Sequence, residues 1–276
     1  MIGTNNGLCK YDGYKVEKIK KSIDDNSFLI ANTLINDIKQ IDQYILIAFN
    51  GGIVLYDYLK DEYLSQYNTL VRLFSGKSVY TIYVLNKSLF IAAKDGLYEF
   101  NWQNKKLKKY GINNKENLNY ELSSDVKILF TKNHFFIVET NFTLYEIDTL
   151  QSVIKKTYDL DEKKYRGGKD IIHYGSSIYV VFEKYGVVKF DESSLEIIGE
   201  PFVIKNKSKI ISKVNCISAI KNKLFIGTDN GLYEYDPLKF SLEEVQTKEK
   251  INIKKSYNID NNLILIDAAK GLVINS

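Results

Sequence analysis

Few side chains in this chain have the types and spacing that catalysis or metal binding requires. His134 and His173 are the only histidines, and an imidazole that binds a metal needs further ligands at set distances. Neither the histidines nor the two cysteines, Cys9 and Cys216, form a pair with metal-ligand spacing. The sequence therefore predicts no metal site, no cofactor and no catalytic residue.

Two further patterns fall short of binding motifs. The stretch Arg166–Lys169 is the nearest approach to a phosphate-binding loop, but Asp170 follows the lysine where such a loop has Ser or Thr. The acidic stretches 24–26 and 159–162 lack the length, the glycine and the terminal Glu of a calcium-binding loop. These patterns favour solvated loops over ion sites.

The chain is organised by one short phrase that recurs seven times, intact or diverged. It reads IGTNNGLCKYD at Ile2–Asp12 and IGTDNGLYEYD at Ile226–Asp236. Its recurrent apolar residue stands at 2, 47, 91, 137, 181, 226 and 266, so the steps run from 40 (226 to 266) to 46 residues (91 to 137). A period of this length built from short strands is typical of a β-propeller blade.

The sixth repeat shows the unit most clearly. Alternating and apolar runs predict four strands in it, at 214–220, 224–228, 232–236 and 240–245. The sequence Asp229-Asn230-Gly231 between the second and third strands suits a tight hairpin, because Asn and Gly tolerate positive φ.

The repeats predict an all-β fold, a seven-bladed β-propeller of four-stranded blades in one domain over residues 1–276. The first repeat lacks a first strand and the last repeat lacks a fourth, so we expect incomplete first and last blades. Each open strand edge carries unpaired backbone groups. We expect an upstream segment or a partner to supply the missing inner strand.

A contact surface follows from this geometry. First strands line the central channel of a propeller, and the connections from a fourth strand to the next first strand share one face with the hairpins between second and third strands. Four of these connections (20–34, 111–124, 159–169 and 203–213) are longer than a turn needs, which is common in binding loops. The candidate ligand-binding residues are Asp37, Lys127, His173 and Asn215 on first strands, and Tyr120, Tyr165 and Arg166 in connections.

The composition limits the class of partner. The net charge is +4, and Arg72 and Arg166 are the only arginines. Arg is the residue best suited to bidentate contacts with phosphates and base edges, so we expect no nucleic-acid partner. No run of 18 apolar residues and no signal segment occurs, so we expect no membrane contact by this segment.

The phrase Leu224–Asp236 resembles the two-component regulator propeller repeat, which reads aromatic-Ile-Gly-Thr, a polar turn, Gly-Leu, then an aromatic residue and Asp. Ile2–Asp12 is similar, and 48–57 and 91–101 are diverged versions. The resemblance implies the extracytoplasmic sensor region of bacterial hybrid histidine kinases and related regulators. It implies a periplasmic location and carbohydrate ligands. The chain departs from that family by lacking Trp in its second strands, since its one Trp is Trp102.

Three functions remain open at this point. The first is a non-enzymatic recognition module that binds a carbohydrate, a peptide or a protein, as in a bacterial sensor. The second is a structural or assembly propeller that docks a protein partner. The third, a propeller lyase or hydrolase, would draw its polar groups from the first strands, which also carry Asn36 and Asn258.

Overall fold

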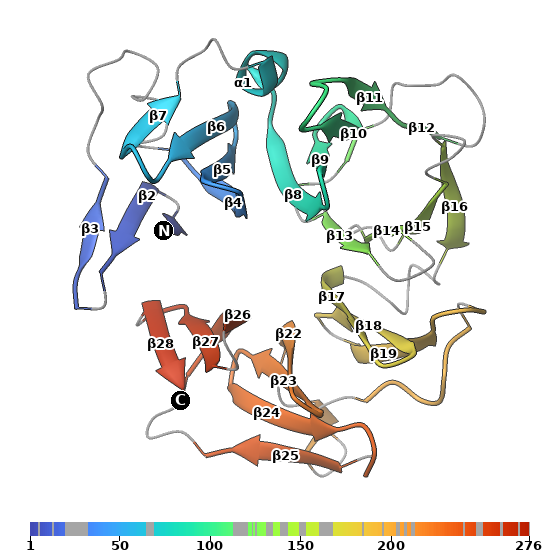
Figure 1. Cartoon of the computed structure of the whole chain (residues 1–276). Helices are drawn as coiled ribbons and strands as arrows, with labels where there is room; N and C mark the ends of the chain where they lie inside the picture. Colours follow the sequence, from blue (N-terminus) through green and yellow to red (C-terminus); the bar gives the residue numbers. More distant parts are fainter. Residues whose placement is uncertain are drawn as a thin grey trace. The chain divides into compact units, whose positions relative to one another are not determined.

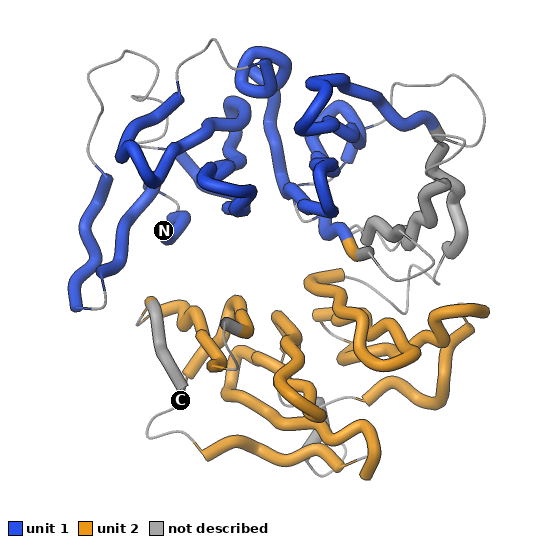
Figure 2. Tube along the Cα trace, in the orientation of Figure 1, with its two compact units in different colours: residues 1–128, 147–155 blue, residues 129–146, 156–276 orange. Residues whose placement is uncertain are grey.

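The structure is a computed structural model of the whole chain. It describes residues 1–4, 6–12, 14–19, 33–64, 69–112, 121–122, 124, 126–130, 135–138, 143–148, 153–159, 168–183, 185–194, 196–202, 205–206, 209–210, 213–239, 241–246, 251–259, 262–269 and 271–275. The chain forms two compact units, residues 1–128 with 147–155 and residues 129–146 with 156–276 (Figure 2). Each unit is treated by itself below.

The first unit begins with three antiparallel sheets, in the strand orders β1-β2-β3, β4-β5-β6-β7 and β11-β10-β9-β8 (Figure 1). The elements are β1 Ile2–Thr4, β2 Gly7–Tyr11, β3 Val16–Lys18, β4 Ile35–Ile41, β5 Tyr44–Phe49, β6 Gly52–Asp57, β7 Glu62–Leu64, α1 Thr69–Phe74, β8 Val79–Leu85, β9 Ser88–Ala93, β10 Gly96–Asn101 and β11 Leu107–Lys109.

A fourth sheet has five strands in the order β12-β16-β15-β14-β13. Its strands are β12 Gly111–Ile112, β13 Lys127–Phe130, β14 Phe135–Val138, β15 Thr143–Asp148 and β16 Val153–Asp159. The strand β12 follows β11 in the chain and pairs in parallel with β16. The extra parallel strand makes this sheet larger than the four strands predicted for each repeat.

The second unit holds three sheets, β17-β18-β19, β22-β23-β24-β25 and β26-β27-β28, and the short hairpin β20-β21. The strands are β17 Gly168–Tyr174, β18 Ser177–Phe182, β19 Gly186–Asp191, β20 Lys205–Asn206, β21 Lys209–Ile210, β22 Val214–Ile220, β23 Lys223–Thr228, β24 Gly231–Asp236, β25 Ser241–Val245, β26 Ile253–Ile259, β27 Asn262–Asp267 and β28 Gly271–Asn275. The four strands predicted in the sixth repeat match β22–β25 to within a residue.

The sheet β17-β18-β19 has three strands, one fewer than the predicted four, for a local reason. Beside β19, the segment 196–202 makes only two isolated bridges, at Ile197 and Phe202. Gly199, with φ of 71°, and Pro201 lie between those bridges and interrupt the ladder, since proline has no N–H to donate. The first sheet and the last have three strands each.

The core lies between neighbouring sheets of one unit. In the first unit, Leu46 and Leu55 of one sheet pack in a cluster with Ile82 and Phe100 of the next. In the second unit, Tyr179 and Val181 pack with Ile217 and Ile226. Burial of both faces explains why the second strands read as apolar runs rather than alternating patterns.

The Gly of the Ile-Gly-Thr phrase is required by this packing. A Cβ at Gly227 would lie 2.6 Å from Cγ2 of Ile253, the first residue of the next sheet. A Cβ at Gly3 would lie 2.6 Å from Cγ2 of Ile35, again the first residue of the next sheet. Glycine at this position therefore sets the close approach of adjacent sheets in both units.

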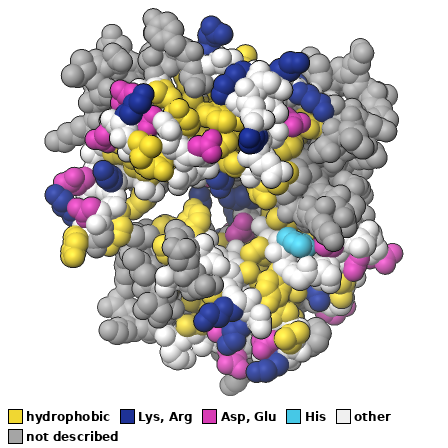
Figure 3. Space-filling view, viewed as in Figure 1, with side chains coloured by type: hydrophobic (Ala, Val, Ile, Leu, Met, Phe, Trp, Pro, Cys, Tyr) yellow, Lys and Arg dark blue, Asp and Glu magenta, His cyan; other side chains and the backbone are white. Residues whose placement is uncertain are grey.

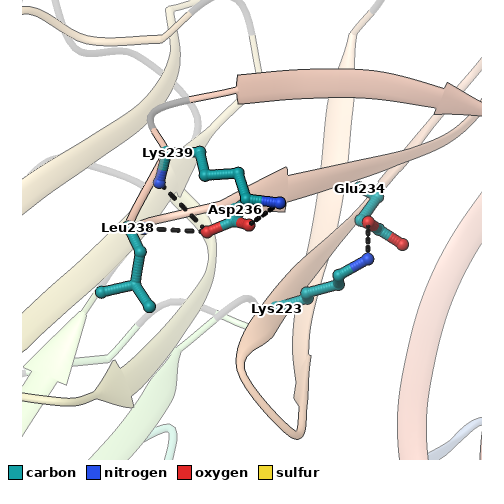
Figure 4. Close-up of polar contacts among 5 residues, drawn as sticks. All are labelled: Lys223, Glu234, Asp236, Leu238 and Lys239. Carbon is teal, nitrogen blue, oxygen red and sulfur yellow. Dashed lines mark hydrogen bonds and ion pairs between the residues drawn. The ribbon is translucent and has the colours of Figure 1, made fainter.

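The Asp that closes the repeated phrase caps the turn into the fourth strand. Oδ1 of Asp236 accepts hydrogen bonds from the backbone N–H groups of Leu238 (2.9 Å) and Lys239 (3.2 Å) (Figure 4). Local bonds of this kind replace the backbone bonds that a tight turn leaves unmade. The same pattern occurs at Asp12, Asp57, Asn101 and Asp191.

Candidate functional site

The first strand of a sheet carries polar side chains that reach the next sheet. The name "first strand" is used here for β4, β8, β17, β22 and β26. Each of these strands has a register shift between its first and third residues. Such a β-bulge turns the second and third side chains out of the regular alternation. The predicted residues Asp37 and Asn215 lie at these positions.

Asp37 is the third residue of β4 and joins it to β8. Its Oδ1 accepts the backbone N–H of Ile38 in its own strand at 2.9 Å. Its Oδ2 accepts the N–H of Ile82 at 2.9 Å and the hydroxyl of Thr81 at 2.8 Å, both in β8. One carboxylate thus accepts the backbone N–H of the fourth residue in each of two adjacent first strands.

Asp170 does the same in the second unit. It is the third residue of β17, and its Oδ1 accepts the N–H of Ile171 at 3.1 Å. Its Oδ2 accepts the N–H of Ile217, the fourth residue of β22, at 3.1 Å. We call this arrangement the carboxylate clamp, formed once by Asp37 and once by Asp170.

The second residue of two first strands supplies an amide in place of a carboxylate. Nδ2 of Asn36 donates to the carbonyl oxygen of Val79, the first residue of β8, at 2.7 Å. Nδ2 of Asn215 donates to the carbonyl oxygen of Ile253, the first residue of β26, at 2.8 Å. Asp37 and Asn215 therefore hold sheets together, and a ligand role for them stays a prediction.

His173 lies at the other end of its strand from this junction. Its Nε2 is 3.0 Å from Oε2 of Glu192, in the turn after β19. The Glu192 side chain is 12% exposed and that of His173 is 29% exposed, so the imidazole is oriented by a largely buried carboxylate.

In the second unit, the predicted residues Asn215 and His173 do not lie together. Within the second unit, Asn215 is near the start of β22 and His173 near the end of β17, two adjacent strands whose third and fourth residues are aligned. His173 lies three residues after Asp170 and Asn215 two residues before Ile217, so the two are five residues apart along the strands, which is roughly 17 Å. Lys127 is half-buried at the start of β13, and Tyr120, Tyr165 and Arg166 lie outside the described residues.

The structure brings together other polar residues where connections enter the first strands. In the second unit, Glu183 follows β18 and lies between two lysines, with Oε1 at 2.9 Å from Nζ of Lys213 and Oε2 at 3.4 Å from Nζ of Lys169. The hydrogen bond from Lys213 lowers the pKa of the Glu183 carboxyl below its ordinary value. Asp229 adds a carboxylate that accepts the backbone N–H of Lys213 at 2.9 Å.

A similar cluster occurs in the first unit. Oδ2 of Asp95 accepts hydrogen bonds from Nζ of Lys77 and from the hydroxyl of Tyr98, both at 2.7 Å. Burial alone would raise the pKa of Asp95, but these bonds outweigh it and leave the pKa below the ordinary value. Nζ of Lys77 also lies 4.7 Å from the centroid of the Tyr98 ring, and Nζ of Lys109 lies 5.5 Å from it.

We call these two groups the entry clusters: Lys169, Glu183, Lys213 and Asp229 in the second unit, and Lys77, Asp95, Tyr98 and Lys109 in the first. They combine fixed ammonium, carboxylate and phenol groups on one part of each unit. Such groups bind hydroxyl-rich or charged ligands through directed hydrogen bonds. The available signal was an acidic residue one or two positions after a second strand (Asp95, Glu183 and Asp229) and a lysine within two residues of the start of a first strand (Lys77, Lys169 and Lys213).

Three observations bear on other site classes. Among the described residues, no group of three or more His, Cys, Asp or Glu could hold a metal ion. The helices in the described part of the chain are too short or too polar to cross a bilayer. Basic and acidic side chains are interspersed on the surface seen in Figure 3.

Comparisons with known proteins link the fold to solved structures. No family model and no curated protein matches the chain. The extracellular domain of the putative hybrid two component system BT4673 from B. thetaiotaomicron is 21% identical, with a TM-score of 0.76 over 99% of this chain and 36% of that one. The corresponding domain of BT3049 from the same organism is 15% identical, with a TM-score of 0.65 over 87% of this chain and 33% of that one.

The likeness extends to a protein of artificial origin. The computationally designed Ika8 protein is 12% identical, with a TM-score of 0.62 over 87% of this chain and 70% of that one. This chain spans about a third of the length of the two extracellular domains. With its repeated sheets and its likeness to these structures, the chain has an all-β propeller fold and resembles the two-component regulator propellers.

Proposed function

We propose that this chain is a non-enzymatic recognition propeller from the extracytoplasmic sensor region of a bacterial signalling protein. The observation that carries the proposal is the match over 99% of the chain to an extracellular domain of a putative hybrid two component system. The close copies of the repeat, Ile2–Asp12 and Ile226–Asp236, support it from the sequence. A periplasmic or extracellular location is part of the same proposal.

The entry clusters are the proposed recognition surface. Their charged groups are already paired and oriented, so that binding a carbohydrate or a peptide would require little reordering of these side chains. The lysine of the second-unit cluster that is most open to solvent is Lys213, whose side chain is 57% exposed. It is therefore the best single residue to test.

The experiment is a binding screen with matched variants. Oligosaccharides and peptides are screened by thermal shift, and a hit is measured by calorimetry on the wild type, Lys213→Ala and Lys223→Ala. Lys223 pairs with Glu234 on β23 and β24 (Figure 4) and serves as the control. We expect at least roughly tenfold weaker binding for Lys213→Ala only, about the loss of one charged hydrogen bond.

A complete screen without a stabilising ligand, together with turnover of a substrate, would contradict the proposal. Equal losses in the two variants would leave a recognition propeller but remove the entry cluster as its surface. The two outcomes thus distinguish a failure of the proposed recognition function from a failure of the proposed recognition surface.

The seven repeats are proposed to form seven blades, with the first and the last incomplete. The three-stranded first and last sheets support the incomplete end blades. We expect the amides of β1 and β28 to exchange with solvent faster than those of β8–β10, because edge groups open at lower free energy. Uniform protection across these strands would speak against incomplete blades.

A further inference from the structure

The carboxylate clamp is absent from the junction between β22 and β26, and the geometry points to an anion-binding site there. The strands β22 and β26 of the second unit lie side by side (Figure 1). We propose that the backbone N–H of Ser256, with the paired hydroxyls of Ser218 and Ser256, binds a carboxylate group of a ligand. This inference names the ligand chemistry of the proposed recognition function and rests on it.

The position of the Ser256 N–H follows from the strand register. Ser256 is the fourth residue of β26 and pairs with Leu265 of β27, as Ile38 pairs with Ile47 and Ile217 with Ile226. In an antiparallel ladder, residues at equivalent positions direct their N–H groups the same way. The N–H groups of Ile38 and Ile217 bind carboxylates outside the ladder, so the Ser256 N–H faces the same open edge.

Both positions that supply the carboxylate elsewhere hold other residues here. The third residue of the preceding strand is Cys216, where Asp37 and Asp170 stand in β4 and β17. The third residue of β26 itself is Lys255. Within the described residues, no side chain accepts a hydrogen bond from the Ser256 N–H, whereas the four matching N–H groups in β4, β8, β17 and β22 each have an aspartate acceptor.

Neighbouring groups suit an anion at this edge. Oγ of Ser218, a residue that is 5% exposed, lies 2.5 Å from Oγ of Ser256. This contact uses only one of the two hydroxyl protons, which leaves one for a ligand at Ser256, the more exposed residue of the pair. Lys254 is exposed two residues before Ser256 and adds positive potential. A ligand carboxylate would thus take the place that Asp37 and Asp170 take at their own junctions.

The geometry of the junction allows a direct test by restoring the clamp. The thiol of Cys216 faces the next sheet, because a Cβ at Gly227 would meet both Sγ of Cys216 (2.5 Å) and Cγ2 of Ile253 (2.6 Å). An aspartate at 216 is thus directed toward β26, as Asp37 is directed toward β8. Cys216→Asp should place a protein carboxylate on the Ser256 N–H, and Cys216→Ala should leave the site open.

The experiment follows backbone amide chemical shifts of the full chain by NMR. Acetate is the probe, added to roughly 0.1 M against equal chloride because salt screens exposed charges. We expect a saturable shift of the Ser256 amide in the wild type and in Cys216→Ala. In Cys216→Asp we expect at least roughly tenfold weaker binding, since the internal carboxylate competes for the same donor.

The amide of Ile217, already held by Asp170, is the control within the same molecule and needs no variant. An acetate response at Ser256 but not at Ile217 supports the site even if Cys216→Asp does not fold. No response at Ser256, an equal response at Ile217, or unchanged binding in a folded Cys216→Asp overturns it. Acetate binding at Ser256, together with turnover of a substrate and no stabilising ligand, would contradict the sensor function and leave this site standing.

Discussion

The junction between β4 and β8 and the junction between β22 and β26 use the same backbone geometry with different side chains. At the first, Asn36 and Asp37 together hold a carbonyl oxygen, two N–H groups and a hydroxyl. At the second, Asn215 holds the equivalent carbonyl oxygen, and Cys216 replaces the aspartate. The difference teaches that one blade contact can be closed internally or left open to a ligand.

The largest effect should come from removing the complete junction's carboxylate. Asp37→Ala leaves the N–H groups of Ile38 and Ile82 without an acceptor, which should lower the free energy of unfolding by about 2–3 kcal/mol. Urea denaturation measures this loss. Cys216→Ala at the open junction is the matched control and should cost less, and equal losses would mean that the two junctions do not differ as described.

A smaller effect is expected at the glycine that sets the spacing of sheets, which occurs at the junction between β22 and β26 and at the contact between β1 and β4. Gly227→Ala places a methyl group against Ile253 and the thiol of Cys216, and overpacking of this kind costs about 1–3 kcal/mol. Gly3→Ala meets Ile35 in the first unit and should show a similar loss in urea denaturation. A neutral result at both positions would show that adjacent sheets can separate without cost.

The side-chain amides of Asn36 and Asn215 should each contribute less still to the free energy of unfolding. Asn36→Ala and Asn215→Ala each remove one side-chain hydrogen bond to a backbone carbonyl oxygen of the next sheet, and each should cost about 1 kcal/mol. Asn36→Ala also removes an exposed bond to Oδ1 of Asn50. At the open junction the Ser218–Ser256 pair remains, and at the other the clamp remains. A much larger loss for Asn215→Ala would indicate that this amide alone holds β22 to β26.

Acid should lower the stability of both units by the same mechanism, whereas each junction variant acts on one unit. Backbone N–H groups of Lys15 and Tyr14 lower the pKa of Asp12 below its ordinary value of 3.8, and those of Ser194 and Ser193 do the same for Asp191. Because the folded pKa is the lower one, the stabilisation is present above pH 3.8 and is lost as the pH falls through the folded pKa.

Circular dichroism during acid titration measures this loss. Asp12→Asn and Asp191→Asn remove one titrating turn each and should flatten the acid limb by similar amounts. A steeper dependence in either variant would contradict the proposed role of these turns.

The sequence carries the strand pattern because that pattern is local. The hairpin glycines and the terminal Asp of each phrase act within four residues, so that repeat six predicts β22–β25 to within a residue. The role of Asp37 is different, since its partners Thr81 and Ile82 are 44 and 45 residues away. Only knowledge of which strands are adjacent turns this aspartate from a ligand candidate into a clamp.

The entry clusters were harder to predict from the sequence for the same reason, because their residues are far apart along the chain. Glu183 contacts Lys169 and Lys213, which belong to two different strands or their approaches. Likewise, Lys77 and Asp95 are 18 residues apart and meet only because β8 and β9 form one sheet. The strand β12 was also not predicted from the sequence, because a strand of two residues is too short to show a periodic pattern.

The interrupted ladder beside β19 has a consequence for solubility. Ile197 and Ile198 in this segment are 40% and 39% exposed, and a continuous outer strand at 196–202 would place them along a flat edge able to pair with a second molecule. Gly199 and Pro201 interrupt that edge, and Pro201 has no N–H to donate. The irregular segment therefore offers a second molecule fewer aligned backbone groups than a continuous edge strand would.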